Sequence, residues 1–337
     1  MPTGALRALG FAYGYSCFLC VLRVLCVESS RMKIREIASG LAFPEGPVAL
    51  DDGSIVLVEI ARGTLTRVAP DGRVSVIADL GGGPNGAALG PDGACYVCNN
   101  GGFRWHRDPV HGLRPVGQPD DYSGGRIERV DLATGKFERL YDTVGGHALR
   151  GPNDLVFDAH GSMWFTDLGK VRARDRDQGG VYYAKHDGSL IREAIYPVLT
   201  ANGVGLSPDA SILYVAETET ARLWAFEVTA PGEVAKQPFP SPHGGRLLHG
   251  AGGYQRFDSL AVDADGNVCV ATLINGGITV VSPRGGTVRH VPMPDLYTTN
   301  VCFGGPDMRT AYVTLSGVGK LVAIDWPVAG LRLDYAR

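Results

Sequence analysis

The chain has 337 residues, of which 45% are hydrophobic and 47 are glycine, and its net charge is −3 at pH 7. This composition is typical of a globular protein with many turns and excludes a disordered chain. The sequence has no basic run or stripe of the kind that binds phosphate backbones, so we expect no nucleic-acid partner.

The first predicted element is an apolar stretch at residues 10–27, which follows Arg7 as in a secretory signal or a weak membrane anchor. Arg23 interrupts this stretch, and no Ala-x-Ala cleavage site follows it. Because a repeat pattern begins at once from Met32, we interpret residues 1–31 as an extra segment that results from a mis-assigned start, with Met32 as the natural first residue. A signal or anchor is the alternative. We therefore expect a cytoplasmic protein without a membrane partner, or a secreted or periplasmic one if the segment is a signal.

Six stretches of similar pattern follow along the chain. Each has a short apolar run, a turn built on Asp-Gly or a close relative, and a β-branched or aromatic run, which predicts a β-hairpin. The stretches begin at Glu45, Asn85, Asn153, Asn202, Asp258 and Asn300. Most are followed by a second hairpin, so that each repeat of about 40 to 70 residues predicts four strands. This spacing is typical of the blades of a β-propeller.

A predicted strand before the first repeat can supply the fourth strand that the sixth repeat lacks. The sixth repeat contains only three predicted strands, the last of them at residues 319–326, and is followed by a coil-like remainder. Residues 33–39 are strand-like and have no partner in the first repeat, so we expect them to form the outer strand of the sixth blade. Such a join would close the ring and protect an open sheet edge. We therefore predict one all-β domain over residues 32–337, a six-bladed β-propeller.

Cys95 and Cys98 form a C-x-x-C pair on a predicted strand of the second repeat. Residues three apart on a strand point to opposite faces, and no second Cys or His pair stands at zinc spacing. We expect these cysteines to be packed thiols without a metal or redox role.

A long insertion, residues 99–125, interrupts the second repeat. Loops of this length are usually functional or disordered. Trp105 and Tyr122 favour an ordered lid over the channel, able to stack on a ring-shaped substrate, and a solvated excursion is the alternative. Asn99 and Asn100 at the base of the insertion and Trp105 within it are candidate substrate contacts.

The six repeats all begin with a side chain that carries an oxygen. In a propeller the first strand of each blade lines the central channel, so these positions converge on its axis. A single Asn or Asp before a strand would be explained by hydrogen bonds to its own turn, but Glu45 has no such role. Two carboxylates and several amides without His or Cys indicate a hard cation and argue against zinc or copper. We expect Ca²⁺, which accepts many oxygen ligands in looser geometry than Mg²⁺.

Four segments, FPEGPV, GPNDLVFD, NGVGLSPD and FDSLAVDADG, occur in this order along the chain. With them, residues 33 to about 326 resemble the SMP-30/gluconolactonase/LRE-like family of six-bladed propellers, which includes gluconolactonase, regucalcin, lactonases of the Drp type and diisopropylfluorophosphatase. The resemblance implies that Glu45, Asn153, Asn202 and Asp258 bind Ca²⁺. It also implies a hydrolase that opens a small-molecule lactone, in which the metal polarises the carbonyl and Asp258 activates water or acts as a nucleophile.

The chain departs from this family at two positions. Gluconolactonases of the regucalcin kind carry an arginine where this chain has Gly151, so Arg150 becomes a candidate substrate contact, together with Asn85. The second calcium site of the phosphofluoridate hydrolase uses an aspartate where this chain has Ala261, so we expect no second metal.

Two other functions remain open at this point. One is an organophosphate or phosphotriester hydrolase on the same metal site, and the other is a non-catalytic propeller that binds a ligand and uses calcium only for structure. The chain has no G-x-S-x-G segment, which argues against a serine hydrolase with a catalytic triad. Asp167 is expected either to face the pocket or to cap a turn.

Overall fold

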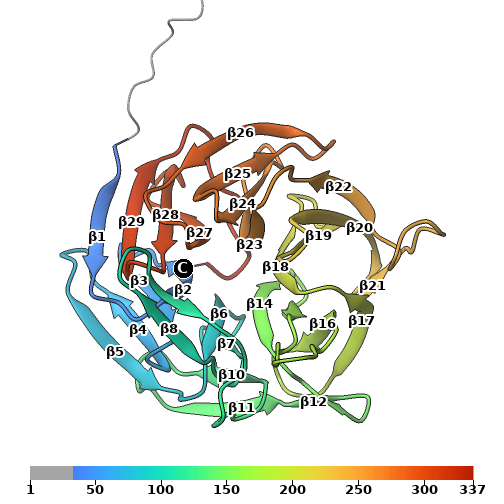
Figure 1. Cartoon of the computed structure of the whole chain (residues 1–337), viewed down its shortest axis with the longest axis horizontal. Helices are drawn as coiled ribbons and strands as arrows, with labels where there is room; N and C mark the ends of the chain where they lie inside the picture. The colour runs from blue at the N-terminus through green and yellow to red at the C-terminus, as the bar shows by residue number, and fades with distance from the viewer. Residues whose placement is uncertain (1–32, 337) are drawn as a thin grey trace, which may run out of the picture. The chain divides into compact units, whose positions relative to one another are not determined.

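The structure is a computed structural model that describes residues 33–336. Within this range the regular structure consists of β-strands, arranged as six antiparallel sheets around a central axis (Figure 1). The prediction of a six-bladed β-propeller is confirmed. The predicted extra segment at residues 1–31 lies outside the described residues. In the described part, no helix is long and apolar enough to cross a membrane.

The first three blades follow one another along the chain, each with its innermost strand first. Blade 1 contains β2 (Pro44–Ala49), β3 (Ile55–Glu59), β4 (Thr64–Val68) and β5 (Val74–Asp79). Blade 2 contains β6 (Pro84–Leu89), β7 (Cys95–Asn99), β10 (Arg126–Val130) and β11 (Phe137–Tyr141). Blade 3 contains β14 (Pro152–Phe157), β15 (Ser162–Asp167), β16 (Gly179–Lys185) and β17 (Ile191–Val198).

The last three blades complete the ring. Blade 4 contains β18 (Ala201–Leu206), β19 (Ile212–Glu217), β20 (Arg222–Ala230) and β22 (Arg246–Gly250), and β21 (Glu233–Val234) pairs with the far end of β20. Blade 5 contains β23 (Arg256–Val262), β24 (Val268–Leu273), β25 (Gly277–Val281) and β26 (Thr287–Pro292). Blade 6 contains β27 (Thr298–Gly304), β28 (Thr310–Leu315), β29 (Lys320–Asp325) and, as its outer strand, β1 (Arg35–Ser39).

Two further hairpins lie outside the blades. They are β8 (Trp105–Asp108) with β9 (Gly112–Pro115) in the insertion, and β12 (Thr143–Val144) with β13 (His147–Ala148) between blades 2 and 3. The insertion is therefore ordered, as its aromatic residues predicted.

Apolar side chains fill the spaces between neighbouring blades. Between blades 3 and 4, for example, Trp164 and Val181 belong to one buried cluster with Leu213 and Phe226. Each such side chain contributes about 1.5 to 3 kcal/mol when it is fully buried. The two thiols of the C-x-x-C pair are free and buried, and they belong to different clusters on the two faces of blade 2, as predicted.

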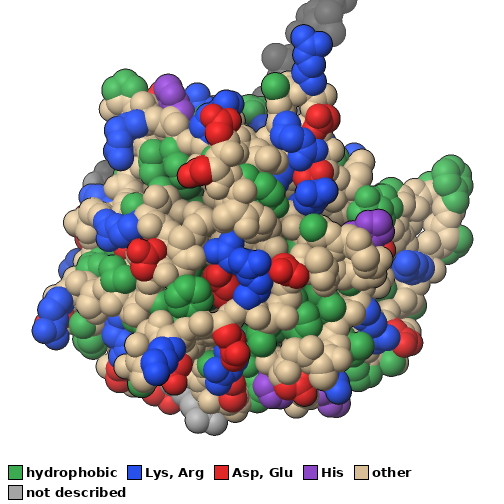
Figure 2. All heavy atoms as spheres, turned by 90° about the horizontal axis from the view of Figure 1, so that it is seen from below, with side chains coloured by type: hydrophobic (Ala, Val, Ile, Leu, Met, Phe, Trp, Pro, Cys, Tyr) green, Lys and Arg blue, Asp and Glu red, His purple; other side chains and the backbone are tan. Residues whose placement is uncertain are grey.

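The outer surface is polar and of mixed charge. Figure 2 shows acidic and basic side chains interspersed over one side of the molecule. Arg129 on β10, for example, pairs with Asp92 at 2.6 Å. Partly exposed pairs of this kind contribute little to stability, about 0 to 1 kcal/mol each.

The innermost strands β2, β6, β14, β18, β23 and β27 surround the axis, and each contacts the next. Residues 327–336 then run across the ends of these strands and close the channel on one side (Figure 1). Leu331 N donates to Val262 O at 2.9 Å, and the Tyr335 ring packs edge-on against Phe157. A mainly apolar cavity of about 120 Å³ remains on the axis above this segment.

Candidate functional site

The site is built from the first residue of each predicted repeat, here called the ring residues: Glu45, Asn85, Asn153, Asn202, Asp258 and Asn300. In every blade the pairing between the first two strands shifts at this point. In blade 3, Pro152 lies opposite Asp167 and Leu155 opposite Phe165, so two residues, Asn153 and Asp154, face one. Such β-bulges re-aim a side chain. They explain why each strand begins with polar residues that would weaken a regular ladder.

Close backbone contacts hold the ring residues of blades 1, 2 and 3 side by side. A Cβ atom on Gly46 would lie 2.6 Å from the carbonyl oxygen of Asn85, and one on Gly86 would lie 2.5 Å from the carbonyl oxygen of Asn153. Distances this short are not tolerated between real atoms, so these positions require glycine. The close approach of the next strand therefore requires glycine directly after the ring residue in blades 1 and 2, at Gly46 and Gly86.

Similar contacts continue through blades 4 and 5. The hydroxyl of Thr166 on β15 donates to the carbonyl oxygen of Asn202 at 2.5 Å, which joins blade 3 to blade 4. A Cβ atom on Gly203 would lie 2.7 Å from the carbonyl oxygen of Asp258, so β18 and β23 are also in backbone contact. The ring residues, although far apart in the sequence, thus lie around one axis.

Glu45 closes the ring against blade 6. Its side chain is 2% exposed, and Oε2 accepts hydrogen bonds from Asn300 Nδ2 and from the backbone N–H of Gly46, both at 2.7 Å. Burial raises the pKa of Glu45 to about 7, against the effect of these hydrogen bonds. Asn300 Oδ1 accepts from the N–H of Val301, so Asn300 supports Glu45 and its own turn.

Two more carboxylates share this buried region. Burial, together with the charge of Glu45, holds the pKa of Asp258 well above its usual range and raises the pKa of Asp154 to about 8. Asp258 is half-buried, whereas Asp154 is buried. The ion pairs among residues 33–336 include none of these three carboxylates. The region therefore concentrates negative charge without a basic partner, and a bound cation would compensate it.

Two amide oxygens of the ring have no hydrogen-bond partner. Asn153 Oδ1 and Asn202 Oδ1 are both buried and unpaired, and the two residues are 4% and 3% exposed. Asn202 Nδ2 is held by Thr218 Oγ1 at 2.9 Å, which leaves its oxygen free. A buried acceptor without a partner costs about 1 to 3 kcal/mol, so such atoms call for an explanation.

A hard cation bound at the ring would supply that explanation. Two carboxylates and two free amide oxygens are a donor set that suits Ca²⁺. Within the described range, no group of three or more His, Cys, Asp or Glu side chains is arranged to hold a metal. A cation at this ring would therefore depend on the amides of Asn153 and Asn202 as well as on Glu45 and Asp258. Asn85 is buried at its own position in the ring.

Asp167 has a structural role. Its carboxylate accepts the backbone N–H groups of Arg150 and Gly151, both at 2.7 Å, and of Gly169 at 2.8 Å. Of the two roles considered for Asp167, the structure shows the cap. It fixes the loop that leads into Asn153.

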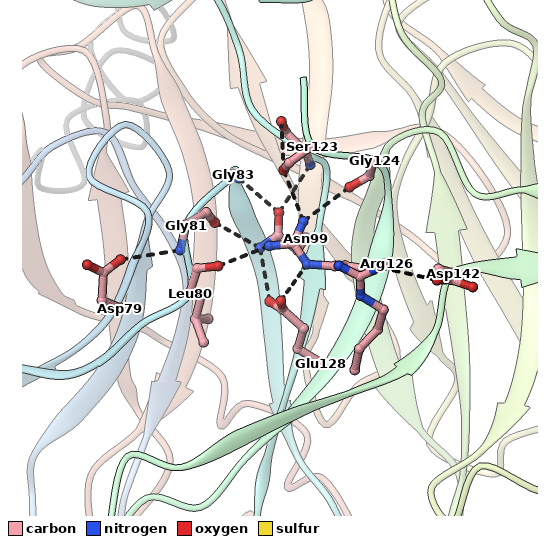
Figure 3. A network of polar contacts seen from close by, with 12 residues as sticks. Asp79, Leu80, Gly81, Gly83, Asn99, Ser123, Gly124, Arg126, Glu128 and Asp142 are labelled. Carbon is pink, nitrogen blue, oxygen red and sulfur yellow. Dashed lines mark hydrogen bonds and ion pairs between the residues drawn. The ribbon is translucent and has the colours of Figure 1, made fainter. Parts of the chain in front are cut away.

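Asn99 was a candidate substrate contact, but its side-chain amide is fully engaged with protein groups, in the network that Figure 3 shows. Its Oδ1 accepts from Gly83 N at 2.9 Å, and its Nδ2 donates to Gly81 O and to Glu128 Oε2. Glu128 in turn pairs with the buried Arg126 at 2.5 Å. This network holds the loop that leads into Asn85, and nothing in the local sequence pattern predicted it.

The insertion spans the mouth of the channel on the side of the ring residues. Leu113 N donates to Gly317 O of blade 6 at 2.9 Å, and Gln118 N donates to Val171 O of blade 3, also at 2.9 Å. Trp105 packs its ring against Phe43, with the ring centroids 5.0 Å apart. These contacts support the lid interpretation over the solvated excursion.

The predicted substrate contacts differ in their surroundings. Trp105 is half-buried, and much of its ring is occupied by protein aromatics. Arg150 is exposed, and its carbonyl oxygen accepts from the Tyr122 hydroxyl at 2.6 Å. Asn100 is 1% exposed and contacts a buried lysine, Lys170, which sequence reasoning did not single out.

Comparison with known proteins gives a consistent result. The sequence profile of the SMP-30/gluconolactonase/LRE-like region matches residues 43–317. A relative named Lactonase drp35 from Staphylococcus haemolyticus is 28% identical over 252 residues, which cover 74% of this chain and 69% of the relative.

Solved structures share the fold. A gluconolactonase from Xanthomonas campestris matches with a TM-score of 0.69 and 22% identity, covering 90% of this chain and 93% of that one. A calcium-binding regucalcin from Agrobacterium tumefaciens matches with a TM-score of 0.70 and 18% identity, covering 91% and 98% of the two chains. At these identities the likeness shows the fold alone.

Proposed function

Because the chain belongs to the SMP-30/gluconolactonase/LRE-like family, we propose that it is a hydrolase that opens a small-molecule lactone with the help of one divalent cation. Glu45, Asn153, Asn202 and Asp258 would hold this cation, and Ca²⁺ suits their oxygens best. The observation that carries the proposal is the pair of buried, unpartnered amide oxygens beside the carboxylates of Glu45 and Asp258 in the ring.

When bound at the ring, a divalent cation would supply Lewis-acid polarisation of the substrate carbonyl. The half-buried carboxylate of Asp258 would accept a proton from the attacking water, whose oxygen bonds to the carbonyl carbon. The ring C–O bond then breaks, and the proton passes to the departing oxygen to give a hydroxy acid. Glu45 is less suited to this role, because it is almost fully buried and its Oε2 already accepts two hydrogen bonds.

Other residues of the chain would bind the substrate and exclude water. Asn85 and Asn100 carry amides beside the mouth of the channel, and Arg150 is exposed at the edge of the insertion. The insertion, with Trp105, would cover the bound ring and keep bulk solvent from the reacting atoms.

The test is proton release from a panel of γ- and δ-lactones, with and without a chelator and after restoring several divalent metals. We expect turnover that chelation abolishes and one metal restores. Asp258→Asn should remove turnover and leave the circular dichroism spectrum unchanged. Unchanged turnover in this variant would remove Asp258 from the mechanism. Phosphotriester turnover without any lactone turnover would favour the organophosphate alternative, and lower stability on chelation with no turnover at all would favour a binding protein.

A further inference from the structure

Lys170 is a buried lysine at the junction between the insertion and blade 3. It follows β15 and is 1% exposed. Its Nζ donates to Gly102 O at 2.7 Å and to Asn100 Oδ1 at 3.0 Å, and it lies 4.2 Å from the centroid of the Phe103 ring. Lysine is rarely buried unless it is paired with a carboxylate. Among residues 33–336 the ion pairs do not include Lys170, so its partners are neutral groups of the insertion.

These contacts fix the orientation of the Asn100 amide. The backbone N–H of Gly102 lies 2.9 Å from the same Asn100 atom that Lys170 contacts. A backbone N–H only donates hydrogen bonds, so this Asn100 atom must be the oxygen. The amide nitrogen, Nδ2, must therefore face the other way, and there it is buried without any hydrogen-bond partner.

Asn100 lies at the same end of the channel as the ring residues. Its backbone N–H donates to Gly83 O at 2.8 Å, and the preceding residue, Asn99, pairs with Pro84 at the start of β6. The next residue of β6 is Asn85, a ring residue. The unpartnered N–H group of Asn100 is thus held at the end of β6 that carries the ring residue Asn85.

Contacts on both sides of Lys170 join the insertion to blade 3. Gln118 N donates to Val171 O, and the Tyr122 hydroxyl donates to Arg150 O. The Tyr122 ring also faces Nζ of Lys170, at 5.4 Å from the ring centroid. A groove of about 470 Å³, lined in part by Gln118 and Val171, runs along this junction. Lys170 bonds to both the backbone of the insertion and the side chain of Asn100.

We propose that Lys170 is a positioning residue: it fastens the insertion to blade 3 and turns the Asn100 amide so that Nδ2 donates to an oxygen of the substrate, the carbonyl or ring oxygen of a lactone. The nature of that acceptor rests on the proposed function. The fastening of the insertion does not, and it can be measured without any substrate.

The first arm of the test replaces Lys170 with Met, which keeps the length of the side chain and removes its donors. In hydrogen exchange of the full chain, we expect amides of residues 101–104 and 117–123 to exchange at least about tenfold faster than in the wild type. The matched control, Lys185→Met, alters an exposed lysine of the same blade and should leave exchange of the insertion unchanged. Unchanged exchange in Lys170→Met would overturn the fastening role.

The second arm separates fastening from donation. In Asn100→Asp the carboxylate can still accept from Lys170 and Gly102, so the insertion should stay protected, but the donor is lost. With the lactone that the wild type turns over best, we expect KM to rise about tenfold with little change in kcat, as for a contact made equally in the ground state and the transition state. Lys170→Met should raise KM similarly.

These two arms distinguish failure of the Lys170 proposal from failure of the proposed lactonase function. Retained protection with an unchanged KM in Asn100→Asp would overturn the donor role of Nδ2. If the wild type turns over no lactone, the proposed function and the donor role both fall. The exchange of Lys170→Met alone then decides whether Lys170 fastens the insertion.

Discussion

Glu45→Gln tests whether the ring concentrates charge that a cation must compensate. The substitution keeps the shape of the side chain, and the amide oxygen of Gln can still accept from Asn300 and Gly46. What is lost is the negative charge. In the absence of metal, the variant should therefore be more stable than the wild type wherever Glu45 is ionised.

The size of the effect follows from the pKa of Glu45, which burial raises from 4.5 to about 7. Each tenfold change in proton affinity corresponds to about 1.4 kcal/mol, so the ionised side chain costs about 3 kcal/mol in the folded state. The folded state binds this proton more tightly than the unfolded state. Its contribution to stability is therefore fully present below pH 4.5 and is lost as the pH rises through about 7.

Urea denaturation in the presence of a chelator measures this difference. We expect Glu45→Gln to exceed the wild type by up to about 3 kcal/mol at pH 8 and to differ by less than about 0.5 kcal/mol at pH 4.5. With excess Ca²⁺ the order should reverse, because an amide is a weaker ligand than a carboxylate. Glu193→Gln, at an exposed position of β17, is the control. A variant that is less stable than the wild type at pH 8 without metal, or equally stabilised at both pH values, would refute the reasoning.

Three further predictions concern the ring and its support. Asn153→Ala removes an unpartnered oxygen, so calorimetry should show a calcium affinity at least about tenfold lower, while the chelated protein should unfold at no lower urea concentration than the wild type. Gly86→Ala forces a Cβ atom to within 2.5 Å of the Asn153 carbonyl oxygen, and we expect a loss of about 3 kcal/mol in thermal unfolding; a loss below about 1 kcal/mol would contradict the close approach. Arg126→Met leaves Glu128 buried without its partner and should cost about 3 to 5 kcal/mol, against less than about 1 kcal/mol for Arg139→Met at an exposed pair.

The fold could be predicted because its information is local. An Asp-Gly turn, or a close relative, between apolar runs predicts each hairpin. The number of such stretches then predicts the number of blades. The ring residues were found for the same reason, since each stands at the same point of its repeat. The β-bulges that aim them could not be foreseen, because a bulge depends on how two strands pair, and the two polar residues at the start of β14 show only that the ladder is weakened there.

Lys170 escaped prediction because its environment is not local. In the sequence it is one of several basic residues after β15, with no feature to separate it from the exposed Arg172 and Arg174. It is buried because residues 99–125 fold back over blade 3. Its hydrogen-bond partners Gly102 and Asn100 lie 68 and 70 positions before it in the sequence. Asp167 shows the opposite difficulty: the sequence admitted both a cap and a pocket role, and only the three backbone donors decided between them.

The composition of blade 6 has a consequence for how the chain reaches its native state. Its outer strand, β1, pairs Arg35 with Ala323, so β1 stays unpaired until β29 has been synthesised. Contacts of such long range slow folding, and the hydrogen bond between Glu45 and Asn300 spans 255 residues in the same way. A chain whose synthesis has not passed β29 therefore cannot yet hold the six ring residues in their native arrangement.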